Sequence, residues 1–234
     1  MITVYSMIFN ENVIMQFMID HYRNRFPNCN IVFYDNESTD NSAQIALNNN
    51  CEVINYPTNN KVDDNKLRTL KNNCWKSAKT DWVLVCDIDE MLDITEDKLK
   101  EEENNGTNII TSEGWNMVNM ENNYDLKNIK YAISEPIYSK PILFNKKYIS
   151  EINYCYGAHN CYPIGTANYS NNIYRLFHYR YINPDYSLQR LHWTRQRFSD
   201  INLRNGWGIQ YMCEDDVIIK EFNNARIIAK KIIE

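Results

Sequence analysis

The acidic residues whose spacing most clearly suggests a chemical role lie in the segment DWVLVCDIDE at positions 81–90. An apolar run of this length predicts a strand buried on both faces, with Asp87 and Asp89 just beyond it. Because side chains alternate along an extended chain, the two carboxylates point the same way. Two hard oxygen donors on one side suit Mg²⁺ or Mn²⁺ shared with substrate phosphates. The alternative is that these acids only end a strand and solvate a turn.

The elements that would position these acids alternate between strand and helix over the first ninety residues. The pattern predicts strands at 2–9, 30–34, 52–56 and 82–86, and helices at 13–25, 42–49 and 66–78. This spacing indicates right-handed βαβ units and a parallel sheet, so the predicted class is α/β. Ligands of such sheets bind at the carboxyl ends of the strands, where Asp35 and Asp87 fall.

The pattern is looser beyond Asp89. It predicts a charged helix at 95–103, a strand at 108–111 and an amphipathic helix at 215–233. The aromatic-rich stretch 154–186 has little periodicity, and we expect loops and an edge strand around a site there. No repeat or linker interrupts the chain, so we expect one domain over 1–234.

Composition excludes several classes of partner and site. The net charge of −5 argues against binding nucleic acid or an anionic membrane through bulk electrostatics. The seven cysteines form no Cys-x-x-Cys pair and no zinc-type cluster, so a reduced, cytoplasmic setting is expected. The N-terminus does not resemble a signal peptide, and no apolar run approaches the ~18 residues of a membrane span.

Three short signatures follow the predicted strands: Asn-Glu at 10–11, DNESTDNS at 35–42 and Asp-Ile-Asp at 87–89. Together they resemble the nucleotide-sugar domain of GT-A-fold glycosyltransferases, close to the inverting family 2 group. The Lys-Asn at 71–72 falls where that family has Arg-Asn. Segments that resemble a small branch found in large DNA viruses and bacteria lie at 140–144, 157–159, 178–181 and 206–211.

The resemblance implies a metal-dependent transferase that passes a sugar from a nucleotide sugar, most often UDP-linked, to a hydroxyl of a glycan, lipid or protein. Mn²⁺ or Mg²⁺ held by Asp87 and Asp89 would bridge the diphosphate and stabilise the leaving nucleotide. The family commonly adds a late histidine as third ligand, for which His178 is the first choice and His159 the second. Residues 1–93 would bind the nucleotide sugar, and 94–234 would supply the acceptor and metal-closing half.

The resemblance also implies a set of donor-binding residues: Asn10, Glu11, Asp35, Arg68, Lys71, Asp87 and Ile88. Asp35 would accept hydrogen bonds from the base or ribose, whereas Ser38 and Thr39 fit better as caps of the next helix. Asn10 and Glu11 would shape the base pocket or simply form a turn.

Two groups of basic residues have two interpretations each. Arg68 and Lys71 would reach the base or phosphate, or lie on a solvated helix face. The cluster of Arg190, Arg195 and Arg197 could face phosphates, but helix-surface charge is the favoured interpretation.

A catalytic base is harder to assign. An inverting transfer needs a carboxylate, or sometimes a histidine, to deprotonate the acceptor hydroxyl. Glu214-Asp215 lies after His178, out of the family's order, and is discounted. Glu113 and Glu135 remain candidates; otherwise the enzyme is retaining or the base is His159.

Three other enzyme classes and one non-enzymatic class share parts of this pattern. A nucleotidyltransferase, methyltransferase or dehydrogenase needs a glycine-bearing loop after the first strand, and residues 8–11 (IFNE) contain none. A non-catalytic glycan-binding module would not need Asp87 and Asp89. For location we expect a soluble cytoplasmic protein, in the host cytoplasm or virion if the chain is viral.

Overall fold

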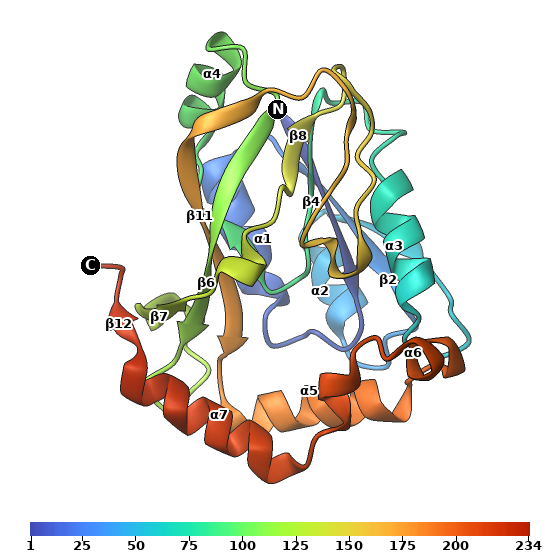
Figure 1. Cartoon of the computed structure of the whole chain (residues 1–234), viewed down its shortest axis with the longest axis vertical. Coiled ribbons are helices and arrows are strands. Elements are labelled where there is room, and N and C mark those ends of the chain that lie inside the picture. Colours follow the sequence, from blue (N-terminus) through green and yellow to red (C-terminus); the bar gives the residue numbers. More distant parts are fainter.

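The first part of the chain folds into parallel strands joined by helices in the computed structural model, which describes residues 1–234. The elements are, in order, β1 (Ile2–Ile8), α1 (Met15–Arg25), β2 (Asn30–Asp35), α2 (Ser42–Asn48), β3 (Glu52–Asn55), α3 (Asp64–Asn73) and β4 (Trp82–Val85). β1 lies between β2 and β4, β2 pairs with β3, and all three pairings are parallel. The predicted α/β class and parallel arrangement are confirmed (Figure 1).

The rest of the chain extends the same sheet with mixed strands. Its strands are β5 (Glu90–Leu92), β6 (Ile109–Val118), β7 (Tyr131–Ser134), β8 (Leu143–Asn145), β11 (Tyr169–Tyr181) and β12 (Lys230–Lys231). The sheet runs β12-β7-β6-β8-β4-β1-β2-β3, and β11 pairs with β5 and β6. β9 (Ile149–Glu151) and β10 (Ile164–Gly165) form a separate antiparallel pair. The antiparallel β8–β4 contact places strands from both parts of the chain side by side.

Side-chain alternation divides the buried residues between the two faces of the sheet. Val4 and Leu84 belong to the core that includes Met18 of α1, whereas Tyr5 and Val85 belong to the core that includes residues of α3. Neighbouring strand residues therefore pack against different helices, as the period of two requires. Helices on both faces explain why β1 and β4 are buried along almost their whole length.

The aromatic-rich stretch corrects one prediction. Residues 169–181 form β11, a strand of 13 residues, where a loop and an edge strand were predicted. β11 pairs in parallel with β6 and, around Phe177, antiparallel with β5, so this part has a neighbour on each side. Its first half is polar and exposed and its second half buried, which removes the regular alternation on which strand prediction depends.

The C-terminal helices lie together across one end of the sheet (Figure 1). They are α5 (Pro184–Gln196), α6 (Asp200–Asn205) and α7 (Asp215–Ile228), and the charged helix α4 (Glu96–Asn104) lies apart from them. Asn183 caps α5 by accepting from the backbone N–H groups of Asp185 and Tyr186. The predicted final helix ends at Ile228, and the chain continues into β12. No helix is both long enough and apolar enough to cross a membrane.

Short 3₁₀ turns complete the chain. They are η1 (Leu126–Asn128), η2 (Pro136–Tyr138), η3 (Tyr156–Ala158) and η4 (Ile209–Met212). η2 matters most for the site described next, because Tyr138 at its end packs against His178 of β11 with ring centroids 4.0 Å apart.

Candidate active site

The predicted acids lie in a tight turn between β4 and β5. The backbone N–H of Glu90 donates to the carbonyl of Asp87 at 3.0 Å, and the Glu90 carboxylate accepts from the Asp87 N–H at 3.0 Å. The Tyr22 hydroxyl, from α1, donates to the Glu90 carbonyl at 2.9 Å. The turn is thus fixed to a helix of the parallel half, at the carboxyl end of β4 where α/β folds bind ligands.

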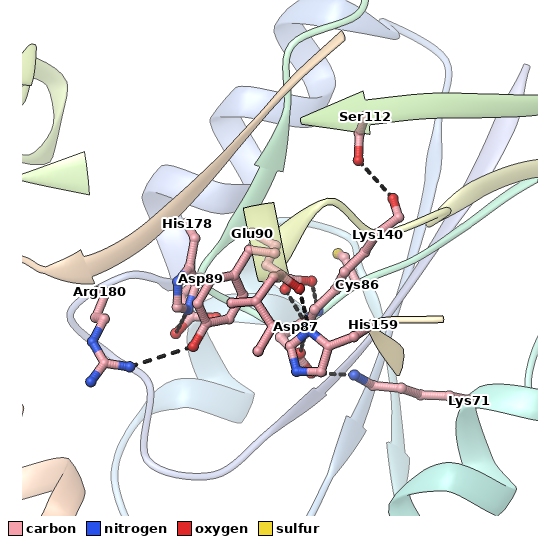
Figure 2. A network of polar contacts seen from close by, with 12 residues as sticks. Lys71, Cys86, Asp87, Asp89, Glu90, Ser112, Lys140, His159, His178 and Arg180 are labelled. Atoms are coloured by element: carbon pink, nitrogen blue, oxygen red, sulfur yellow. Dashed lines mark hydrogen bonds and ion pairs between the residues drawn. The ribbon is translucent and has the colours of Figure 1, made fainter. Parts of the chain in front are cut away.

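Asp87 lies between two ammonium groups (Figure 2). Lys71 Nζ donates to Oδ1 at 2.6 Å, and Lys140 Nζ donates to Oδ2 at 2.9 Å. The surrounding protein desolvates the carboxyl group, but attraction to Lys140 and Lys71 outweighs this and holds its pKa below the usual range. The Asp87 side chain is 36% exposed, so it is the member of the pair that solvent reaches.

Lys140 is the most buried cation of the site. Its side chain is 3% exposed and pairs with Glu90 at 2.5 Å as well as with Asp87. Burial alone would lower the pKa of Lys140, but Asp87 and Glu90 raise it above the ordinary value. Lys140 therefore stays charged and fixes two carboxylates.

Asp89 is enclosed by residues of the C-terminal part. Arg190 Nη1 donates to Asp89 Oδ2 at 2.8 Å, and His178 Nε2 lies 3.6 Å from the same oxygen. The Asp89 side chain is 8% exposed. Burial would raise its pKa, but Arg190 and then His178 lower it well below the usual range. Arg190 faces the site, so its interpretation as helix-surface charge was wrong.

Glu11 shares Arg190 with Asp89. Arg190 Nη2 lies 3.2 Å from Glu11 Oε1, and the Tyr186 hydroxyl donates to Glu11 Oε2 at 2.6 Å. Burial raises the pKa of Glu11 to about 7, although Arg190 and Tyr186 oppose the rise. Both Tyr186 and Arg190 come from α5, so this helix is docked on the end of β1.

Asn10 organises the turn after β2. Its Oδ1 accepts from the backbone N–H groups of Thr39 and Asp40, and its own N–H donates to Ser38 Oγ at 3.1 Å. Asp35 Oδ1 accepts from the Ser38 N–H at 3.0 Å within the same turn. The predicted capping role of Ser38 and Thr39 was wrong, because their hydroxyls contact Asn10 and α2 has no side-chain cap.

The other predicted donor residues differ in position. Lys71 reaches Asp87, whereas the Arg68 guanidinium lies over the Tyr156 ring, 4.4 Å from its centroid, and pairs with no carboxylate. Ile88 is 3% exposed and belongs to the core next to α1. Its expected donor contact stays a prediction.

The two histidines proposed as metal ligands have different surroundings. His178 Nδ1 lies 2.7 Å from Asn116 Oδ1, which leaves Nε2 directed at Asp89. His159 Nδ1 lies 2.6 Å from the Ile137 carbonyl, and its ring meets Tyr138 edge-on. Burial lowers the pKa of His159. Of the two, only His178 lies against one of the paired acids.

The oxygen chemistry of Asp87 and Asp89 fits a divalent ion, but their present contacts are those of ion pairs. No group of three or more His, Cys, Asp or Glu side chains is arranged to hold a metal. Lys71 and Lys140 use both oxygens of Asp87, and Arg190 uses Oδ2 of Asp89. A metal on these carboxylates would therefore meet the positive charge of these three cations at close range.

The base candidates lie on β6 and directly after its neighbour β7. Glu113, on β6, accepts from the Trp115 indole N–H at 3.0 Å. Glu135 follows β7 and is half-buried. Neither pairs with a residue of the 87–90 turn, and their catalytic role stays a prediction.

The ion pairs of Lys140 could not be predicted from the sequence. Lys140 begins one of the segments that resemble the viral and bacterial branch, but a lysine before an apolar strand has no distinctive spacing. Its partners are 50 and 53 positions away in the chain, so local pattern carries no signal for the contact. The one available signal was a charged residue directly before the apolar run Pro-Ile-Leu-Phe.

No protein-family model and no curated protein sequence matches the chain. Solved structures do match. Staphylococcus aureus TarS shares 15% identity with a TM-score of 0.47, over 97% of this chain and 43% of that chain. The TarS fragment 1–349 in complex with UDP-GlcNAc shares 14% identity with a TM-score of 0.46, over 97% of this chain and 72% of that chain. This chain therefore spans less than half of the full TarS chain.

Two further matches are more distant. The glucosyl-3-phosphoglycerate synthase of Mycobacterium tuberculosis with Mn²⁺, UDP-glucose and phosphoglyceric acid gives 13% identity and a TM-score of 0.42, over 68% of this chain and 62% of that one. The Pyrobaculum calidifontis mannosyltransferase PcManGT with GDP-mannose and Mn²⁺ shares 15% identity with a TM-score of 0.36, over 47% of this chain and 34% of that chain. The matches are GT-A glycosyltransferases, as the motifs predicted. At these TM-scores and identities they assign no residue role, donor or acceptor to this chain.

Proposed function

We propose that the chain is a glycosyltransferase that uses a nucleoside-diphosphate sugar with UDP as the nucleotide. The observation that carries the proposal is the cluster around Asp87 and Asp89. This cluster lies where β4 ends beside β1. In it, acids from the glycosyltransferase-like motifs form ion pairs with cations from α3, α5 and the segment before β8.

The cations suit the chemistry of a departing nucleoside diphosphate. The leaving group gains negative charge as the sugar's anomeric bond breaks, and preorganised cations near that charge stabilise the transition state. Lys71 is the best placed to do this, because it is bound to the exposed acid Asp87 and its flexible stem allows the ammonium group to turn to a phosphate. Lys140, held between two acids, would keep Asp87 in position.

A divalent ion belongs to the proposal through Asp87 and Asp89, with His178 as the third side chain. When bound, such an ion supplies Lewis-acid stabilisation of the diphosphate. Asn116 would hold the His178 ring so that Nε2 faces Asp89. For the acceptor we propose a hydroxyl of a glycan, lipid or protein, with Glu113 or Glu135 as the base of an inverting transfer.

Release of UDP from a panel of UDP-sugars, with GDP-sugars for comparison, tests the proposal on the full chain with Mn²⁺ present. We expect turnover of at least one donor, and we expect Asp89→Asn to reduce it at least about 100-fold, since a charge that binds the reacting centre is lost. Thermal unfolding of the variant checks that it is folded.

Asp81→Asn is the matched control, because Asp81 pairs with exposed Lys147 at the start of β4, away from the turn. It should turn over donor as the wild type does. Equal turnover in Asp89→Asn and Asp81→Asn would show that Asp89 takes no part in the reaction. Release of no nucleotide from any sugar by folded protein would count against the transferase and favour a binding module.

A further inference from the structure

Arg190 covers the carboxylate that a metal would need. The Asp89 side chain is 8% exposed and Arg190 is 31% exposed, and Arg190 Nη1 donates to Asp89 Oδ2 at 2.8 Å. The same guanidinium lies 3.2 Å from Glu11. A cation that binds Asp89 through this oxygen therefore meets the positive charge of Arg190 at close range, and it binds more strongly once Arg190 has moved away.

Other contacts keep α5 docked without Arg190. The Tyr186 hydroxyl donates to Glu11 at 2.6 Å, and the Trp193 ring meets Phe9 edge-on with centroids 6.1 Å apart. Just beyond α5, Arg197 donates to the carbonyl of Asn36 at 3.1 Å. Because these contacts hold the backbone to β1 and β2, the Arg190 side chain can leave Asp89 by rotation about its own bonds.

The balance of charge in the cluster indicates which ligands would move the Arg190 side chain away from Asp89. Lys71, Lys140 and Arg190 are paired with the carboxylates of Asp87, Asp89, Glu90 and Glu11, so the acids outnumber the cations. A diphosphate alone adds negative charge to a cluster whose three cations are already paired with carboxylates. A divalent ion alone must compete with an arginine that already forms a charge-assisted hydrogen bond. The two together remove both obstacles, because the phosphates can take the guanidinium while the ion takes the carboxylate.

We propose that Arg190 is an exchangeable counter-ion: it occupies Asp89 in the free protein, passes to the diphosphate of the bound nucleotide, and thereby makes divalent-ion binding depend on the nucleotide. This inference rests on the proposed function. By linkage, the nucleotide and the ion must then strengthen each other's binding by the same factor.

Calorimetric titration of Mn²⁺ into the full chain, with and without saturating UDP, tests the exchange without any turnover. We expect UDP to tighten Mn²⁺ binding at least about tenfold, within the usual range of coupling between sites. Arg190→Gln should bind Mn²⁺ more tightly than wild type in the absence of UDP, bind UDP more weakly, and show little coupling.

Arg195→Gln is the matched control on the same helix. Arg195 contacts the carbonyls of Tyr211 and Cys213 and lies near Asp215, so its loss removes an α5 charge without touching Asp89. It should keep the wild-type coupling.

The outcomes separate this inference from the function on which it rests. If UDP binds and Mn²⁺ affinity is the same with and without it, or if Arg190→Gln couples like wild type, the exchange is refuted while nucleotide binding stands. UDP binding with no Mn²⁺ binding in either state refutes it too. If folded protein binds neither UDP nor GDP under any condition, both the exchange and the proposed function fail.

Discussion

Lys140 has the strongest single-residue role in the cluster, because its buried ammonium group pairs with both Asp87 and Glu90. Lys140→Met would leave two carboxylates without their shared cation. Breaking a buried ion pair from one side costs about 3–5 kcal/mol. We therefore expect a loss of that size in the free energy of unfolding, measured by chemical denaturation.

Lys147→Met provides the comparison, since Lys147 pairs with Asp81 while 62% exposed. A surface pair contributes about 0–1 kcal/mol. Equal losses in the two lysine variants would mean that the buried pairing of Lys140 has no special energetic weight.

His21 gives the fold a defined response to acid. It is buried in α1 with Nε2 3.0 Å from the Leu92 carbonyl, and burial lowers its pKa to about 3. The unfolded chain takes up the proton near the ordinary value of about 6.5, whereas the folded chain resists until far lower pH. The His21 contribution to stability is therefore lost as pH falls from about 6.5 towards 3.

Unfolding free energies of wild type and His21→Gln between pH 7 and pH 4 measure this contribution. The difference between wild type and variant should shift in favour of the variant as pH falls. A difference that stays constant over this range would show that His21 titrates normally in the folded protein.

At the residue scale, the sequence singles out residues where a motif and a strand end coincide. An apolar run ends in alternating acids at Asp87 and Asp89, and Lys71 stands at a family position. Their roles in the site stay predictions. The pairing of Asp89 with Arg190 joins residues 101 positions apart, and only the docking of α5 creates it. Neither periodicity nor composition contains that information, so the sequence favoured a solvated helix face for Arg190.

At the scale of elements, the close packing of β6 on η2 positions Tyr138 and the segment leading to Lys140. A Cβ at Gly114 of β6 would lie 2.5 Å from the Glu135 carbonyl oxygen and 2.6 Å from the Tyr138 carbonyl carbon. Gly114→Ala must therefore push η2 away from the strand. We expect a loss of about 1–3 kcal/mol in stability, typical of overpacking, together with weaker UDP binding.

Gly106→Ala is the control for backbone strain. Gly106 has φ +81° and nothing within 4 Å of an added Cβ, so the only destabilisation of the variant comes from the left-handed backbone conformation. It should lose stability in denaturant titrations but bind UDP like wild type. If Gly114→Ala binds UDP as tightly as wild type does, the position of η2 has no effect on nucleotide binding.

Element prediction was accurate where burial is uniform and failed where it changes along one strand. β1 and β4 are buried along almost their whole length and are mostly apolar, so their sequences predicted strands. β11 is exposed at Tyr169 and buried from Leu176 to Tyr179, because its second half inserts between β5 and β6. Its polar half therefore resembled a loop, and the pairing that orders it is long-range.

At the scale of the whole molecule, the candidate site exists only because distant segments meet at one end of the sheet. The turn after β4 supplies the acids, α3 and the segment before β8 supply lysines, and α5 supplies Arg190. The net charge of −5 gives no hint of a site for an anionic nucleotide. The local cations, and an ion bound with the nucleotide, would have to provide the attraction.

Calorimetric titration of UDP, with GDP as the control nucleotide, into the full chain with and without Mn²⁺ tests whether the site binds a nucleotide together with a divalent ion. We expect that UDP binds, that Mn²⁺ strengthens its binding, and that GDP binds more weakly. Binding of neither nucleotide to well-folded protein in either condition would contradict it.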